Sequence, residues 1–349
     1  MEKYFRDKRF KELYISSINN CKEHLKEVIQ CNSPLYNFTD HSLTHSQRIE
    51  SRIISLYKEL FEGSNADVYL NDAEIYILIM SIYLHDIGME LMNEDRLLKL
   101  FEIRSYKNKF TQSLVDKITI EEIKEAKTNS EDFYNFIRKN HHIISALWIM
   151  RSQEKKEFAL PILDGYANFI AQICFAHNED VEVLGEVYYS KTSYHDNTIE
   201  LKVLSYLLRI GDALDGDRSR VNIQVQNIKD IPVISRIHWY RHYFTKSIFC
   251  QDRNISIVFE FPENECLEDE LETYFIDNTK KWLEVNIDDL MRRKILESSI
   301  RNKYLKYTVQ VEELEYGFIT SIDEEARCRI KEEIVGNKSA SIVVKKKIM

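Results

Sequence analysis

Residues 74–85 (EIYILIMSIYLH) are apolar on every side of a helix except at its ends. A helix of this kind has no face to present to water, so other parts of the fold must surround it. The chain of 349 residues contains only 8 glycines and 4 prolines, far below the average share of roughly 12%. This scarcity of turn residues argues against an all-β sandwich and favours long helices with short connections. The sequence therefore predicts a mainly α-helical protein with residues 74–85 at its centre.

Apolar residues at helical spacing predict further helices on both sides of this segment. They cover residues 9–29, 40–61, 94–103, 111–127, 133–150, 160–177 and 199–213. Asp40 can serve as the N-cap of the second stretch. Residues 104–132 are the most charged part of this half, so we expect them to form a helical insertion on the surface.

After residue 220 the pattern changes to β-branched and aromatic runs, which favour strands. Strands are predicted at residues 222–228, 239–250, 254–261 and 307–314, with a hairpin turn at 251–253. Residues 266–303 have a helical pattern, and residues 339–347 fit one more strand or a solvated tail. We therefore expect an all-helical domain over residues 1–220, followed by a small α+β accessory or oligomerisation domain over residues 221–349.

The charge of the chain limits its partners. With 48 basic and 57 acidic side chains, the net charge is −9, which disfavours duplex DNA and anionic membrane surfaces as partners. No apolar run reaches the ~20 residues of a membrane helix, and the charged first residues contain no signal-peptide core, so we expect a cytoplasmic protein. The six cysteines lack the close pairs of a zinc ribbon or redox dithiol, and we expect reduced, mostly buried thiols.

Histidines and aspartates recur at or near the ends of the predicted helices. They are His45, the dyad His85-Asp86, His141, His142, His177 and Asp212. Imidazole and carboxylate ligands suit Mn²⁺, Fe²⁺, Co²⁺, Ni²⁺ or Zn²⁺, and carboxylates also accept Mg²⁺. Neighbouring helical residues point about 100° apart, so His85 and Asp86 can reach one ion only where the helix ends, with freedom from Gly88. An aspartate can bridge two ions, whereas a histidine holds one.

The order His…His-Asp…His…His…Asp resembles the HD superfamily of metal-dependent phosphohydrolases. More narrowly, the segments DHSLTHSQRI, LHDIGM, RKNHH, HNE and LLRIGDALDGDR are similar to bacterial HD domains associated with GHKL-type ATPases and defence modules. The resemblance covers residues 35–245. It implies a helical HD bundle that holds one or two divalent metal ions per chain, and an enzyme that hydrolyses phosphoester bonds.

The resemblance also implies roles for single residues. The primary metal ligands match His45, His85, Asp86 and Asp212, and the extra histidines of the two-metal subset match His141 and His177. His141 is preferred to His142 because Ser145 follows it by four residues, as in related members. The residues expected in catalysis are His85, Asp86, Arg138 and His142, and those expected to bind substrate are His41, Arg138, Lys139 and Arg218.

The implied mechanism is metal-assisted hydrolysis. Arg138 or Arg218 would neutralise charge that grows on the phosphoryl oxygens, and His142 or His41 would protonate the leaving oxygen. Arg218 is an equally good ion-pair partner for the aspartates at positions 215 and 217.

Three functions fit this pattern. The first is a nucleotide hydrolase that acts on a deoxynucleoside triphosphate or signalling oligonucleotide, in keeping with a role in anti-phage defence. The second is a single-strand nuclease, which the net charge and the lack of a Lys/Arg-rich segment disfavour. The third is a non-catalytic nucleotide sensor that signals to a partner protein. Exposed strand edges in the second domain favour a homo-oligomer or a partner complex.

Overall fold

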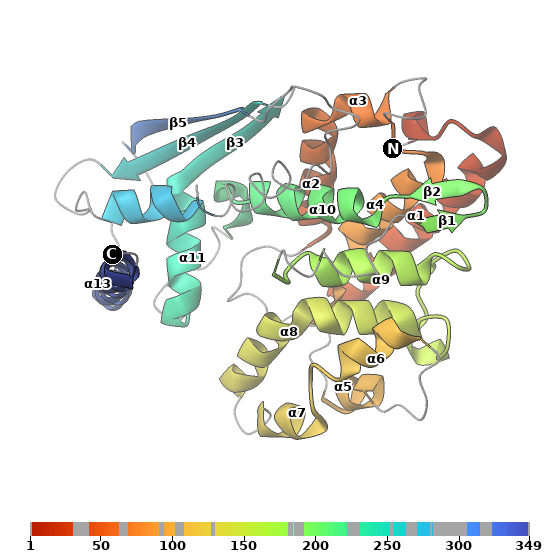
Figure 1. Ribbon diagram of the computed structural model, residues 1–349, viewed down its shortest axis with the longest axis horizontal. Helices are drawn as coiled ribbons and strands as arrows, with labels where there is room; N and C mark the ends of the chain where they lie inside the picture. Colours follow the sequence, from red (N-terminus) through yellow and green to blue (C-terminus); the bar gives the residue numbers. More distant parts are fainter. Residues whose placement is uncertain are drawn as a thin grey trace. The chain divides into compact units, whose positions relative to one another are not determined.

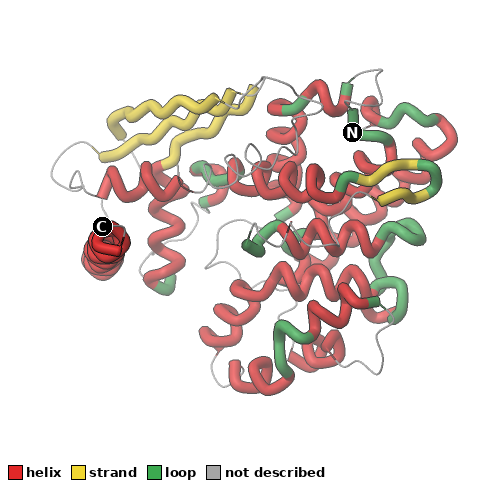
Figure 2. Tube along the Cα trace, viewed as in Figure 1, coloured by secondary structure: helices red, strands yellow, loops and turns green. Residues whose placement is uncertain are grey.

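Helices account for most of the described chain, drawn in red in Figure 2. In this computed structural model the described residues are 2–30, 42–62, 69–90, 94–101, 108–126, 130–180, 184, 192–221, 231–251, 254–262, 271–279, 281, 306–314 and 323–347. They fall into two compact units, one that runs from the N-terminus to Gly211 and one that begins at Asp212. The predicted fold class, a helical bundle with a small α+β part after it, is confirmed. The predicted division at residue 220 stays a prediction.

The first unit consists of helices and one small hairpin (Figure 1). Its α-helices are α1 (Lys8–Gln30), α2 (Leu43–Leu56), α3 (Lys58–Phe61), α4 (Asp72–Leu84), α5 (Glu94–Phe101), α6 (Lys109–Val115), α7 (Ile120–Ala126), α8 (Ser130–Arg151), α9 (Ala167–Ala176) and α10 (Leu201–Leu214). Short 3-10 turns are η1 (Glu2–Tyr4), η3 (Ile87–Glu90) and η4 (Lys156–Phe158). Strands β1 (Thr192–Tyr194) and β2 (Asn197–Ile199) pair antiparallel.

Helix α4 is the centre of the first unit. Asn71 starts it through a capping box, in which the Asn71 side chain accepts from the backbone N–H of Glu74 and the Glu74 carboxylate accepts from that of Asn71. From Ala73 to Leu84 every residue is buried. Helices α1, α2 and α9 and strand β2 pack around it. The buried central helix predicted from residues 74–85 is therefore confirmed, and its C-terminal end presents His85 and Asp86.

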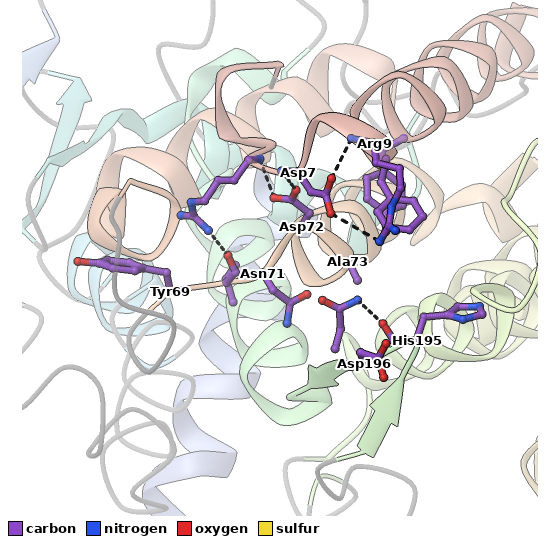
Figure 3. Close-up of a pocket in the computed structure, with 13 residues that line it drawn as sticks. Asp7, Arg9, Tyr69, Asn71, Asp72, Ala73, His195 and Asp196 are labelled. Carbon is purple, nitrogen blue, oxygen red and sulfur yellow. Dashed lines mark hydrogen bonds and ion pairs between the residues drawn. The ribbon is translucent and has the colours of Figure 1, made fainter.

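The start of α1 is tied to the start of α4 (Figure 3). The Asp72 carboxylate accepts hydrogen bonds from the backbone N–H of Arg6, at 2.8 Å, and of Asp7. The Arg6 guanidinium donates to the carbonyl oxygen of Leu70 at 2.6 Å. These groups and the β1–β2 turn border a cavity of about 450 Å³. None of the predicted metal ligands lines this cavity, and Arg6 and Asp72 hold the N-terminal segment in place.

Three predicted helices of the first unit differ from the structure. The helix predicted to continue to Phe61 is divided into α2 and α3 at Tyr57, whose backbone leaves the helical region (φ −126°, ψ 41°). Residues 111–127 form two short helices, α6 and α7, because Thr119 and Glu122 exchange side-chain and backbone hydrogen bonds and so begin a new helix. Residues 160–177 form a helix only from Ala167 onward, since Gly165 takes up φ +79° in the turn that precedes it. The β1–β2 hairpin was not predicted, because its strands of three residues lack a strand pattern.

The second unit combines a sheet with helices. Its elements are η7 (Arg218–Arg220), α11 (Val233–Phe244), β3 (Thr245–Gln251), β4 (Asn254–Pro262), β5 (Lys306–Leu314) and α13 (Glu324–Lys347). The strand order is β3-β4-β5, with β3 antiparallel and β5 parallel to β4. Helix α11 packs against α13, η7 and the strands β3 and β4. No helix among the described residues is long and apolar enough to span a membrane.

Two strand predictions in the second unit are wrong. Residues 239–250 are not one strand, because helix α11 extends to Phe244 and only then does β3 begin. The aromatic residues Trp239, Tyr240 and Phe244 are fully buried there on a helix, so aromatic content reflected burial and not strand geometry. Residues 339–347 belong to α13, which continues without a break to Lys347.

The remaining predictions for the second unit are met in part. The predicted strands at 254–261 and 307–314 are present as β4 and β5. Of the predicted helix at 266–303, residues 271–279 are helical. The predicted strand at 222–228, most of the turn at 251–253 and the rest of 266–303 lie outside the described residues, as does the N-cap predicted at Asp40.

Helix α10 approaches α2 closely at Gly211. A Cβ atom on this residue would lie 2.6 Å from Cδ1 of Ile53 and 2.9 Å from Cγ2 of Ile49, both buried. Real Cβ atoms do not come so near their neighbours, so only glycine allows this approach. The contact fixes the last turn of α10 against the helix that carries His45.

We predict that Gly211→Ala lowers the melting temperature by several degrees, because overpacking a buried contact costs about 1–3 kcal/mol. Gly336→Ala in α13 is the matched control, since nothing lies within 4 Å of its added Cβ. There the helix gains roughly 0.5–1 kcal/mol from alanine. Thermal unfolding followed by circular dichroism measures both, and a Gly211→Ala variant as stable as the wild type would contradict the close approach.

Candidate metal centre

Four histidines surround the carboxylate of Asp86. Oδ2 of Asp86 lies 3.2 Å from Nε2 of His85 and 3.6 Å from Nε2 of His45. Oδ1 lies 3.3 Å from Nε2 of His141 and 3.7 Å from Nε2 of His177. Each oxygen therefore faces its own pair of imidazoles. This is the arrangement expected of an aspartate that bridges two cations.

The four histidines come from four different helices. His45 lies in the first turn of α2, His85 is the C-cap of α4, His141 lies within α8 and His177 is the C-cap of α9. His45 and His85 have no exposed surface, and Asp86 keeps 11% of its side chain exposed. The centre is thus largely buried, with Asp86 more exposed than His45 and His85.

Three of the histidines are oriented in the same way. Nδ1 of each lies against the backbone carbonyl oxygen three residues earlier, at 2.9 Å for His85 and 2.6 Å for His141. His177 makes this contact with the carbonyl of Cys174. A carbonyl can only accept, so Nδ1 carries the proton and Nε2 keeps its lone pair. Such backbone contacts fix the tautomer of metal-binding histidines in proteins.

The nitrogens that face the centre fit a cation. Nε2 of His141 lies 2.9 Å from Nε2 of His177, and Nε2 of His45 lies 3.4 Å from that of His85. Two imidazole lone pairs at such distances repel each other unless a proton or a cation lies close to both. The side chains His85, Asp86 and His177 have ligand atoms within 4.8 Å of one another. Nitrogen and carboxylate donors in this mixture suit a divalent transition metal.

Asp212 is placed by helix α10, which continues unbroken past Gly211. Its role as a metal ligand, which the resemblance implies, stays a prediction. Nη1 of Arg220 lies 3.8 Å from Oδ1 of Asp212, and the same guanidinium lies 3.9 Å from Asp215. Arg220 is therefore the ion-pair partner of both carboxylates.

The turn after Asp86 packs directly on α8. Gly88 donates its backbone N–H to Oγ of Ser145 at 2.8 Å. A Cβ atom on Gly88 would lie 2.4 Å from the carbonyl oxygen of His141. The absence of a side chain at Gly88 thus brings Asp86 within reach of His141. Ser145, which the sequence singled out only as a neighbour of His141, holds this turn in register.

His142 points to a different carboxylate. Its Nε2 lies 3.1 Å from Oε1 of Glu179, and the same oxygen lies 3.2 Å from Nζ of Lys117. Burial alone would raise the pKa of Glu179, but the hydrogen bonds and charges of His142 and Lys117 outweigh it and lower that pKa. The Glu179 carboxylate is therefore ionised near neutral pH. Of the two adjacent histidines, His141 faces Asp86 and His142 faces Glu179.

The remaining predicted site residues are Arg138, Lys139, Arg218 and His41. Nη1 of Arg218 lies 2.7 Å from Oε2 of Glu260, and its Nε donates to the carbonyl of Tyr243, all within the second unit. Lys139 is exposed. Arg138 contributes its backbone carbonyl to His141. His41 lies outside the described residues. The substrate-binding roles of these four residues stay predictions.

Several residues near the centre were not predicted as part of it. Arg209 donates to the carbonyl oxygens of Ala176 and Glu179 and so secures the end of α9 beside His177. Burial and the charge of Asp86 raise the pKa of Glu90 to about 7. The HNE segment contains Glu179, and its spacing from His177 was the one available signal. Arg209 lies in the segment LLRIGDALDGDR, which indicated only Asp212, and Glu90 carries no pattern that distinguishes it from an ordinary surface charge.

Comparison with known families agrees with this geometry. The family described as HD-CE matches residues 34–293, which is well over half of the chain. The chain belongs to the HD-CE family. This confirms the HD-type resemblance and supports a hydrolase-like HD domain with a divalent metal centre. Neither a curated protein nor a solved structure matches the chain.

We predict that His141→Ala lowers the metal content of protein purified without chelator, because its Nε2 faces Asp86 at 3.3 Å. His142→Ala, the neighbouring control, should retain the wild-type content because His142 faces Glu179. Elemental analysis by mass spectrometry measures both. Equal loss in the two variants, or a wild type without bound transition metal even after incubation with Mn²⁺, would contradict the assignment of ligands.

Proposed function

We propose that this protein is a metal-dependent phosphohydrolase that cleaves phosphoester bonds of nucleotides. The observation that carries the proposal is the position of Asp86, whose two carboxylate oxygens each face a separate histidine pair. Membership of an HD-type family supports the same chemistry. An ordinary buried ion pair would need one histidine and not four.

In this proposal His45, His85, Asp86, His141 and His177 would hold the divalent cations, with Asp212 added as the ligand that the family resemblance implies. Divalent cations supply Lewis acidity to a phosphoryl oxygen and lower the pKa of water. The backbone carbonyls behind His85, His141 and His177 keep their Nε2 lone pairs directed inward. The protein thus provides a rigid donor set that does not need to rearrange when substrate arrives.

His142 is the proposed proton donor. The ionised Glu179 carboxylate accepts from its Nε2 and so keeps a proton on that atom. Its ring centroid lies 5.6 Å from that of His141 and 6.2 Å from that of His177, so the His142 ring adjoins two of the proposed metal-binding histidines. A positioned acid of this kind is typically worth about 10²–10⁴ in rate.

The proposed substrate class follows from the charge of the chain. A deoxynucleoside triphosphate or a signalling oligonucleotide suits a net-acidic protein that must rely on cations to attract phosphate. A role in anti-phage defence, beside a GHKL-type ATPase, follows from the motif resemblance alone. We also propose that the second unit mediates self-association or binds a partner protein. Sedimentation velocity of the full chain tests self-association, for which a monomer at all concentrations would be the contrary result.

We predict that the wild type releases phosphate or a nucleoside product in a screen of nucleotides, cyclic dinucleotides and single-stranded DNA with Mn²⁺, Co²⁺, Ni²⁺ or Mg²⁺. Asp86→Ala should abolish this turnover and keep the helical content, because α4 is complete before residue 86. Asp132→Ala, an exposed aspartate of α8, is the control and should keep full activity.

Equal rates for the wild type and Asp86→Ala would mean that the activity comes from a contaminant or another site. If the wild type consumed no compound but a nucleotide raised its melting temperature, the protein would be a nucleotide sensor, and the hydrolase proposal would be wrong.

A further inference from the structure

Lys117 links the predicted surface insertion to the metal centre. It lies between α6 and α7, and its ammonium lies 3.2 Å from Oε1 of Glu179. The same ammonium lies over the ring of Phe175, 5.1 Å from its centroid. The ring of His142 stacks on Phe175 from the sequence-distant α8, with centroids 5.9 Å apart. The ammonium of Lys117 is thus packed against Glu179 and Phe175, and both of these residues contact His142, the neighbour of His141.

Exposure falls in steps from this lysine toward the centre. The exposed fraction of the side chain is 38% for Lys117, 15% for Glu179 and 11% for Asp86. Lys117 is therefore the most exposed residue of this group. His141 and His177, which face Oδ1 of Asp86, are more buried. The ammonium of Lys117 is therefore accessible to an anion in solvent.

The ion pair of Lys117 with Glu179 can be exchanged. Glu179 has a second donor on the same oxygen, Nε2 of His142, so its charge is not left without a partner when the ammonium moves away. Ion pairs at such exposure are weak because water screens them. A phosphate group carries more negative charge than one carboxylate and can take the ammonium in its place.

We propose that Lys117 is a phosphate-binding residue of the site, which contacts a phosphate group of the substrate beyond those that the metal centre holds. The proposal rests on the proposed phosphohydrolase function and adds a residue that the motifs did not indicate. The proposal assigns a function to the charged insertion, which positions the exposed side chain of Lys117 beside a centre made of acidic residues and histidines. The ligand class is a compound with at least two adjacent phosphate groups, such as a nucleoside di- or triphosphate.

The test is calorimetric titration of the full-length protein with imidodiphosphate and Mg²⁺, a probe that does not depend on turnover. We expect Lys117→Gln to weaken binding about tenfold, and Lys117→Arg to stay within about threefold of the wild type. Lys124→Gln, which removes the same charge from an exposed site on α7, is the matched control and should bind as the wild type does.

Glu179→Gln separates a phosphate contact from a structural ion pair, because it breaks the same pair from the other side. It should not weaken imidodiphosphate binding, since it removes a competing negative charge. Equal weakening by Lys117→Gln and Glu179→Gln, no effect of Lys117→Gln, or no binding by the wild type would each overturn the proposal. If Lys117→Gln weakens binding while the wild type hydrolyses no phosphoester, the phosphate site stands and the proposed function fails.

Discussion

The close contact between the turn after α4 and helix α8 determines the rest of the centre. Asp86 can face histidines from α8 and α9 only because Gly88 lets its backbone come against the carbonyl of His141, where a Cβ would lie 2.4 Å away. Ser145 then fixes the turn through the backbone N–H of Gly88. Without this contact Asp86 would keep His45 and His85 on one side and lose the pair on the other.

The packing of the buried helix α4 offsets the free-energy cost of placing polar groups at its C-terminal end. Helix α4 has no exposed residue from Ala73 to Leu84, so its position is set by packing on all sides and its C-terminal end is held rigidly. Polar groups at that end are buried as well, and burial of such groups is costly unless each has a partner. Backbone carbonyls satisfy the outer nitrogens of His85, His141 and His177, which leaves the inner nitrogens for a cation.

The sequence indicated the residues of the centre better than it indicated their hydrogen-bond and ion-pair partners. His45, Asp86 and His177 could be found because their motifs follow a known order, and residues 74–85 because an apolar helix must be central. The partners of His142 could not be found this way. Lys117 lies in a charged segment that resembled a solvated surface, and Glu179 is one acidic residue among 57 acids. Only the fold brings Lys117 and His142 to the same aromatic ring, that of Phe175.

The errors in the second unit have a related cause. Residues 239–250 combine aromatic and β-branched side chains, which pack equally well on a buried helix face and on a sheet, and α11 takes Trp239, Tyr240 and Phe244 into the core of that unit. The sequence offered Arg218 as a phosphate ligand or as an ion-pair partner of Asp215 and Asp217, whereas its ion pair with Glu260 of β4, 42 positions along the chain (260 − 218), was not foreseen. Contacts between residues so far apart leave no local pattern.

The central claim is that Asp86 bridges a metal centre, and anomalous diffraction from crystals grown with Mn²⁺ tests it most directly. The account predicts anomalous density enclosed by the Asp86 carboxylate and the Nε2 atoms of His45, His85, His141 and His177. Anomalous density confined to other parts of the protein, with the four histidines and Asp86 fully ordered and no density among them, would contradict it.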